Sequence, residues 1–169
     1  MRPVSPWIEK HANLIPKGQP VIDVACGGGR HSLFLLEQGH EVLAVDIDTS
    51  AIASFEGRRG LTIIKSDLEG AAWPFPLESA GAIVVVNYLW RPLFPYMYET
   101  LRPGSILLYD TFAQGNEKYG RPRNPDFLLA PGELIERLEG AFDVIDCFDG
   151  YTEEPVPACR QSVAARKRF

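Results

Sequence analysis

The sequence predicts one α/β domain, built on a mostly parallel β-sheet that carries helices on both of its faces. Short, continuously apolar segments alternate along the chain with stretches whose apolar residues recur at helical spacing, and this alternation is typical of such sheets. The 169 residues are 46% hydrophobic and 23% charged, which supplies one continuous core of ordinary composition. No internal repeat, low-complexity tract or composition shift divides the chain, so we expect a single domain over residues 1–169.

The first half of the chain follows this alternation after an N-terminal helical segment over residues 1–19. We expect strands at residues 21–26, 41–46 and 61–65, and helices at residues 30–38 and 49–58. Leu33 and Leu36 share one face of the first of these helices, and Gly39 is placed to end it. Thr49 or Ser50 can cap the second one, because a side-chain oxygen there can accept from a free backbone N–H.

The second half continues the pattern and adds a hairpin. We expect strands at residues 82–86, 105–109, 142–147 and 158–165, a helix whose buried face is Leu93, Tyr96, Met97, Thr100 and Leu101, and a helix that Pro131 opens, with Leu134, Ile135 and Leu138 on one face. A polar loop over residues 113–130 separates the two helices. The last two strands are joined by residues 149–157, too few for a helical crossover, so they should pair as an antiparallel hairpin.

Charge and cysteine content exclude several classes of function. The chain has 17 basic and 22 acidic residues, a net charge of −5, which disfavours sequence-independent binding to nucleic acid or to an anionic membrane. Its three cysteines form no CxxC pair, as expected of a reducing compartment rather than a disulfide or zinc scaffold. No apolar run is long enough for a signal peptide or a membrane span. We therefore expect a cytoplasmic protein without a metal site.

Chemistry-bearing residues gather at the predicted carboxyl ends of the strands, where open α/β sheets bind their ligands. They are Gly27, Gly28, Gly29, Asp46, Asp67, Asn87 and Asp110. Glycines let the backbone turn sharply and approach a ligand, and the helix that follows offers free N–H groups. Asp46 lies 19 residues after Gly27, a spacing that suits a carboxylate binding the two hydroxyls of a ribose. The two features together favour a nucleoside-containing ligand. Ser32 replaces the last glycine of the dinucleotide fingerprint, which alone does not exclude NAD(P).

Two segments carry a resemblance to a known family. The segments VIDVACGGGR (residues 21–30) and EVLAVDID (residues 41–48) resemble motif I and the acidic second-strand motif of class I S-adenosylmethionine-dependent methyltransferases. Arg30 stands where many members carry a last glycine, and this variant is similar to the bacterial tellurite-resistance-type small methyltransferases. The resemblance covers residues 20–112. It implies a doubly wound, Rossmann-like, seven-stranded sheet with a terminal antiparallel hairpin, and S-adenosyl-L-methionine as the cofactor.

The resemblance also implies roles for individual residues. The glycines would pass beneath the methionine moiety, Asp23 would lie near its amino group, and Asp46 would bind the ribose. Asp67 would face the adenine amino group, although a helix-capping role is an equal alternative there. The whole implied cofactor set is Asp23, Gly27, Gly28, Gly29, Arg30, Asp46, Ile47, Asp67, Leu68 and Asn87.

Candidates for acceptor binding come from the segments after the fourth and fifth strands. They are His31, Tyr88, Trp90, Arg91, Phe112, Tyr119 and Arg121, the last two in the loop over residues 113–130. Aromatic rings beside arginines suit a small, partly anionic or polarisable acceptor. Packing of the loop is the alternative role for Trp90 and Phe112, and surface packing is the alternative for His31. Cys26 is expected to be a small buried residue rather than a nucleophile.

The leading hypothesis is therefore S-adenosylmethionine-dependent methyl transfer to a small-molecule acceptor. No residue is assigned as a catalytic base, because alignment of the two reactants can supply most of the rate. The segment from Val86 to Pro92 has no NPPY-type motif, which argues against amine groups of nucleic acid as acceptors. An NAD(P)-dependent oxidoreductase and a non-catalytic S-adenosylmethionine-binding protein are the alternatives.

Overall fold

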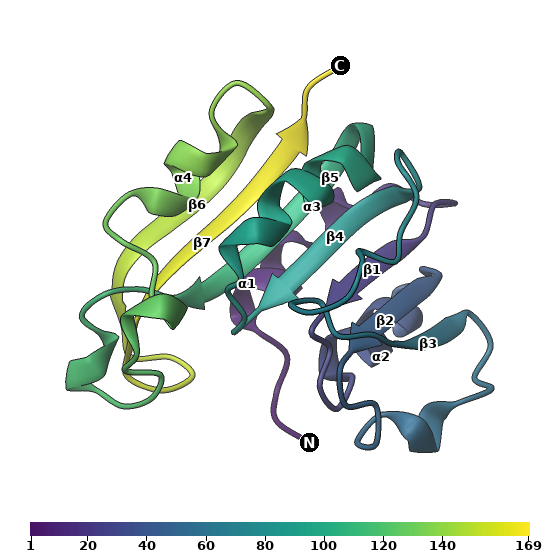
Figure 1. Cartoon of the computed structure of the whole chain (residues 1–169), viewed down its shortest axis with the longest axis horizontal. Coiled ribbons are helices and arrows are strands. Elements are labelled where there is room, and N and C mark those ends of the chain that lie inside the picture. Colours follow the sequence, from purple (N-terminus) through teal and green to yellow (C-terminus); the bar gives the residue numbers. More distant parts are fainter.

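The computed structural model describes residues 1–169 and contains one seven-stranded sheet in the order β3-β2-β1-β4-β5-β7-β6 (Figure 1). The strands are β1 (Val21–Val24), β2 (Val42–Asp46), β3 (Leu61–Lys65), β4 (Ala80–Val86), β5 (Leu101–Phe112), β6 (Phe142–Thr152) and β7 (Ala158–Lys167). The first five strands are parallel to one another, and β7 is antiparallel to both β5 and β6. The predicted mostly parallel sheet with its terminal hairpin is confirmed.

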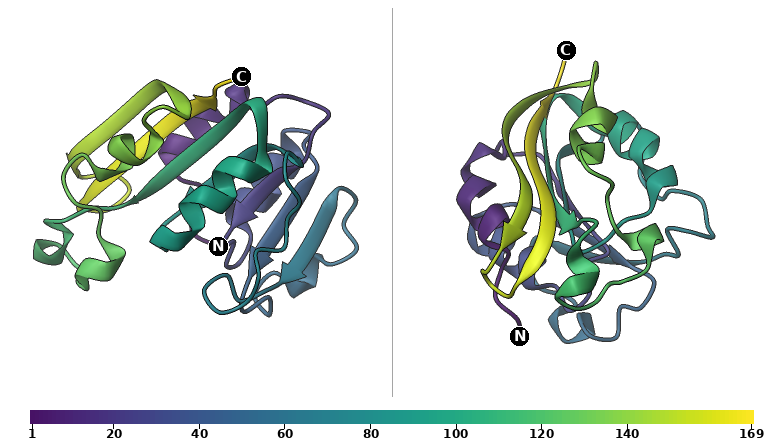
Figure 2. Two further views of the ribbon diagram at one scale, coloured as in Figure 1. Left: turned by 45° about the horizontal axis from the view of Figure 1, so that its top comes forward. Right: turned by 90° about the vertical axis from the view of Figure 1, so that its left-hand side faces the viewer.

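Helices cover the two faces of the sheet. The helices α1 (Pro6–His11) and α2 (Arg30–Glu37) lie on one face, whereas α3 (Phe94–Thr100) and α4 (Glu133–Leu138) lie on the other (Figure 2). Strand β4 shows why its sequence is continuously apolar: Ala82 and Val84 pack toward α1 and α2, and Ile83 packs toward α3. Every β4 residue is buried, as expected for a central strand that is covered twice.

The helix predicted over residues 49–58 is wrong. This crossover contains only a 3-10 turn, Ala53–Phe55, and Glu56 after it is already extended. Gly57 and Gly60 both adopt positive φ, 83° and 84°, so the segment bends back to β3 instead of continuing a helix. Ile52 is nevertheless fully buried, and it packs beneath the start of α2.

Two other helices differ from the sequence-based expectation in detail. The last helix begins at Glu133 rather than at Pro131, because Gly132 takes a left-handed conformation with φ 72° immediately before it. Tyr96 and Ile135, which were expected on buried faces, are 50% and 36% exposed. Their side chains therefore lie at the margins of α3 and α4 and contribute little to the core.

The fold brings five strand ends to one edge of the sheet. The parallel strands β1 to β5 end there, and the antiparallel β7 begins there, since Arg160 pairs with Phe112 at the end of β5. Residues 1–19 hold α1 and a 3-10 turn, Ala12–Leu14, and the chain before α1 crosses this edge (Figure 1). None of the helices combines the length and the apolar character that crossing a bilayer requires.

Candidate functional site

Three pockets lie in a row along this edge, and neighbouring pockets share walls. The N-terminal pocket, of about 450 Å³, is lined by Arg2, Pro3, Val4, Ser5, Pro6, Arg30, Val86, Asn87, Asp110, Phe112, Pro155, Val156 and Arg160. The glycine-turn pocket, of about 380 Å³, is lined by Met1, Arg2, Ala25, Cys26, Gly27, Gly28, Arg30, His31, Val86 and Asn87. The Asp46 pocket, of about 270 Å³, is lined by Ala25, Asp46, Ile47, Ser66, Asp67, Leu68, Glu69 and Tyr88. Together they form one continuous candidate site.

Asp46 and the glycine turn hold each other in place. The Gly27 N–H donates to Asp46 Oδ2 at 2.8 Å, and the Asp48 N–H donates to Asp46 Oδ1 at 3.0 Å. Because each carboxylate oxygen can accept a second hydrogen bond, Asp46 can still bind a ligand while it is fixed by the backbone. Gly29, with φ 82°, is the residue before the first turn of α2.

We expect Gly29→Ala to lower the free energy of unfolding by about 2 kcal/mol or more. A Cβ at this position would meet Ile52 Cδ1 at 2.5 Å, and an alanine would also be strained at φ 82°. Urea denaturation measures the change. The control is Gly120→Ala, where a Cβ meets nothing within 4 Å. Equal stability of the two variants would show that the turn relaxes freely.

The Asp46 pocket combines carboxylates with apolar side chains. Leu68 is 7% exposed and Ile47 lies open beside it, so the pocket offers apolar surface between two acidic residues. Asp67 lines the pocket and also accepts from the Glu69 N–H at 3.0 Å, so its local structural role and a ligand role are compatible. Tyr88 donates to Glu69 Oε1 at 3.1 Å and lies in this pocket. Tyr88 therefore lies with Asp46 and apart from the N-terminal pocket, and its role at the acceptor stays a prediction.

Asp23 lies beneath the glycine turn rather than in a pocket. Ser32 Oγ donates to its carboxylate at 2.6 Å, and burial raises the pKa of Asp23 to about 6. Since it lines none of the three pockets, the structure offers it no direct ligand contact, and the role near an amino group stays a prediction. Cys26 is 6% exposed, and burial raises the pKa of its thiol, in line with an unreactive packing residue.

His31 holds the N-terminal segment. The Ser5 N–H donates to His31 Nε2 at 3.1 Å. Burial, together with the nearby Arg30 guanidinium, lowers the pKa of His31 to about 4, so the imidazole is neutral at neutral pH. A neutral ring that accepts a backbone hydrogen bond does not attract a carboxylate. His31 lines the glycine-turn pocket, so its contact with an acceptor stays a prediction.

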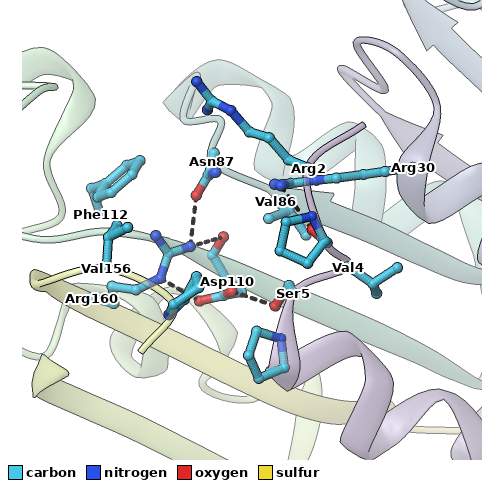
Figure 3. Close-up of a pocket in the computed structure, with 13 residues that line it drawn as sticks. Arg2, Val4, Ser5, Arg30, Val86, Asn87, Asp110, Phe112, Val156 and Arg160 are labelled. Carbon is cyan, nitrogen blue, oxygen red and sulfur yellow. Dashed lines mark hydrogen bonds and ion pairs between the residues drawn. The ribbon is translucent and has the colours of Figure 1, made fainter. Parts of the chain in front are cut away.

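A buried polar network joins the N-terminal segment to β4, β5 and β7 (Figure 3). Asp110, at the carboxyl end of β5, accepts from Ser5 Oγ at 2.7 Å, Ser162 Oγ at 2.7 Å and Arg160 Nε at 2.9 Å. Arg160 Nη2 donates in addition to Asn87 Oδ1 at 2.7 Å. Asn87 adopts φ 56°, which is uncommon outside glycine. This network fixes one wall of the N-terminal pocket.

The N-terminal pocket is rich in guanidinium groups. Arg2, Arg30 and Arg160 line it, and Asp110 is the one carboxylate in its wall. Arg30 Nη1 donates to the Pro3 carbonyl at 3.0 Å. Burial, followed by the neighbouring Arg2 and Arg160 charges, lowers the pKa of Arg30. The ring of Phe112 packs 4.5 Å from the Arg160 guanidinium.

Arg91 holds the loop over residues 113–130, and neither Arg91 nor Trp90 lines one of the three pockets. Arg91 forms two hydrogen bonds to the Glu133 carboxylate, at 2.8 and 2.9 Å, and donates to the carbonyls of Asp126 and Leu128. Trp90 packs against the core. These contacts engage the guanidinium of Arg91, and neither residue lines the three pockets, so acceptor binding by Arg91 and Trp90 stays a prediction.

The loop itself follows β5 at the expected edge but lies beside the hairpin of β6 and β7 (Figure 1). Tyr119 packs against Tyr151 of β6, with ring centroids 4.8 Å apart. Arg121 is exposed, and neither residue lines any of the three pockets. Of the acceptor candidates, Phe112 lies in the N-terminal pocket.

Sequence reasoning missed Arg160, Ser5 and Arg2. A signal existed for Arg160: a strand antiparallel to β5 begins at the edge where β5 ends, so the first residues of the predicted last strand belong to the site. The N-terminal segment carries no comparable pattern. Its position depends on the hydrogen bond from Ser5 to Asp110, which lies 105 positions further along the chain.

Comparison with known proteins adds independent information. Residues 21–104 match a family described as a methyltransferase domain. Trans-aconitate 2-methyltransferase of Azoarcus sp. (strain BH72) is 29% identical over 126 residues, which cover 72% of this chain and 48% of that protein. The chain therefore spans about half the length of this curated relative.

Solved structures share the fold. TehB from Haemophilus influenzae superposes with a TM-score of 0.79 at 20% identity, covering 98% of this chain and 63% of that one. A SAM-dependent methyltransferase from Methanosarcina mazei superposes with a TM-score of 0.73 at 16% identity, covering 99% of this chain and 100% of that one. At these identities the likeness establishes a common architecture.

Proposed function

We propose that the chain is an S-adenosylmethionine-dependent methyltransferase, which transfers the methyl group of S-adenosyl-L-methionine to a small-molecule acceptor. The observation that carries the proposal is the row of three connected pockets, in which the glycine turn and Asp46 adjoin a third cavity. The methyltransferase family match covers the glycine turn, Asp46 and Asn87, and it does not favour the oxidoreductase alternative.

The glycine-turn and Asp46 pockets fit the cofactor. A Cβ at Gly27 would meet nothing within 4 Å and one at Gly28 would only touch Ala51, so the backbone lies open to a ligand. In this proposal the glycines face the methionine moiety, Asp46 accepts from the ribose hydroxyls, and Leu68 packs on the adenine. The cofactor supplies an electrophilic methyl group on its sulfonium. The protein then has to hold the nucleophile in line with that group.

The N-terminal pocket is the proposed acceptor site. It shares Arg30, Val86 and Asn87 with the glycine-turn pocket, so an acceptor there would lie beside the methionine end of the cofactor. Its volume of about 450 Å³ suits a small molecule. The Azoarcus relative is named for methyl transfer to trans-aconitate, also a small molecule. The net charge of −5 and the three free cysteines support a cytoplasmic protein without a nucleic-acid partner.

Calorimetric titration is expected to show binding of S-adenosylhomocysteine and no binding of NAD. Transfer of a labelled methyl group to a panel of small carboxylates, thiols, phenols and amines then tests catalysis. Tight NAD binding without a response to S-adenosylhomocysteine would contradict the proposal. Cofactor binding with no transfer across the whole panel would instead favour the non-catalytic alternative.

A further inference from the structure

Three arginines from three separate elements converge on the N-terminal pocket (Figure 3). Arg2 comes from the segment before α1, Arg30 from the first turn of α2, and Arg160 from the beginning of β7. Arg2 makes no side-chain hydrogen bond, and Arg30 uses only Nη1, so both keep donors for a ligand. Figure 3 shows these two side chains extending toward Asn87, where the pocket joins the glycine turn.

The charges of this pocket are unbalanced. Its single carboxylate, Asp110, already accepts three hydrogen bonds, from Ser5, Ser162 and Arg160. Asp110 therefore compensates Arg160 and leaves the positive charges of Arg2 and Arg30 without a partner. Arg30 is partly buried and Arg2 is exposed at the mouth of the pocket, so an anion that enters between them would be attracted by both positive charges. Arginine is suited to this task because its planar donor pair matches a carboxylate.

The same pocket contains no carboxylate without a counter-charge and no histidine. Besides the three arginines, Asp110 is the one titratable side chain in its lining, and it forms an ion pair with Arg160 and accepts three hydrogen bonds. His31 lies behind Ser5, and its Nε2 is occupied by the Ser5 N–H. An alcohol, phenol or amine would need a base to remove its proton, so this geometry favours a nucleophile that is already ionised at neutral pH.

We propose that the acceptor is a small organic polycarboxylate, with one carboxylate held by Arg2 and Arg30 and another receiving the methyl group as its ester. This inference rests on the proposed function. A carboxylate oxygen forms a bond to the methyl carbon while the bond from that carbon to sulfur breaks, and the electron pair of the broken bond stays on sulfur. The sulfonium becomes a thioether, the carboxylate becomes a neutral ester, and no proton moves.

The remaining wall of the pocket fits such a molecule. Val86, Phe112 and Val156 supply apolar surface for a short carbon skeleton between the charged groups. The two uncompensated positive charges of Arg2 and Arg30 together balance the negative charge of an acceptor with two carboxylates. After transfer, one carboxylate is lost as the ester and the other stays bound to the arginines.

Calorimetry with tricarballylate, a compact tricarboxylate, tests binding without any turnover. We expect Arg2→Gln and Arg30→Gln each to weaken tricarballylate binding at least tenfold. The control Arg59→Gln removes the same charge at an exposed position in the β2–β3 crossover and should change the affinity by less than twofold. The neutral trimethyl ester of tricarballylate should not bind. Equal affinity in all three variants, or equal binding of the neutral ester, overturns the proposal.

Labelled-methyl transfer to tricarballylate, glutarate, selenite, thiols and amines tests the chemistry. The expected product is a methyl ester, which releases labelled methanol in alkali. Transfer only to a thiol, an amine or the inorganic oxyanion overturns the polycarboxylate proposal and leaves the methyltransferase function standing. Titration of the same proteins with S-adenosylhomocysteine scores the cofactor site separately. If S-adenosylhomocysteine does not bind, the proposed function fails. The affinities of the arginine variants for tricarballylate still test whether Arg2 and Arg30 bind a polycarboxylate.

Discussion

Replacing Asp46 by alanine is expected to lower the affinity for S-adenosylhomocysteine at least tenfold while the fold survives. The change removes two charge-assisted hydrogen bonds to the ribose, each worth on the order of 1.5–3 kcal/mol. It also removes the 2.8 Å contact that fixes the Gly27 N–H, so the glycine turn loses an anchor. A tenfold loss corresponds to about 1.4 kcal/mol, which is close to the loss of one of these two hydrogen bonds alone.

Isothermal titration calorimetry measures this affinity, with circular dichroism to establish that the variant is folded. Asp48→Ala is the matched control, because Asp48 follows the same strand and accepts only from its neighbour Ser50. It should bind S-adenosylhomocysteine within twofold of the parent protein. Unchanged affinity in Asp46→Ala would show that this carboxylate serves only the local turn.

The second large effect is expected at Asp110. Asp110→Asn should lower the free energy of unfolding by about 3 kcal/mol, because it leaves the buried Arg160 guanidinium without its counter-charge. Arg160 and Asp110 are only 11% and 7% exposed, so water cannot replace the lost interaction. The Ser5 hydroxyl also loses a charged acceptor, which should loosen the N-terminal segment.

Urea denaturation of Asp110→Asn and of Asp143→Asn decides this point. Asp143 forms a 2.7 Å ion pair with Arg168, but the two side chains are 65% and 52% exposed. Its loss should cost less than about 1 kcal/mol, as is usual for exposed pairs. Similar destabilisation of the two variants would mean that the buried network contributes no more than a surface pair.

The parts that could be predicted from the sequence are those encoded by neighbouring residues. The glycine turn and Asp46 lie at the ends of two apolar segments that can be identified locally, and the paired strands bring them together. The antiparallel pairing of the last two strands could be predicted because residues 149–157, which join them, are too few for a helical crossover. The prediction of a helix over residues 49–58 relied on a capping residue and on apolar residues. It was wrong because Gly57 and Gly60, both at positive φ, turn the chain back toward β3.

Side-chain partners far along the chain could not be predicted. Arg91 stands after β4 among aromatic residues, as a ligand-binding arginine would, but Glu133, 42 positions later, binds it instead. Arg160 contacts Asp110 across 50 positions and Asn87 across 73. A positive charge was expected near the acceptor on the residue types alone, but which arginines supply it depends on tertiary contacts.

The path of the N-terminal segment has a practical consequence for the design of fusion proteins. Met1 and Arg2 line the glycine-turn pocket, whereas Phe169 is fully exposed at the opposite end of the molecule (Figure 1). An affinity tag or reporter joined ahead of Met1 would start at the mouth of the site and could obstruct ligand entry. A tag joined after Phe169 avoids this region. Assays of this chain are therefore best made with carboxyl-terminal tags.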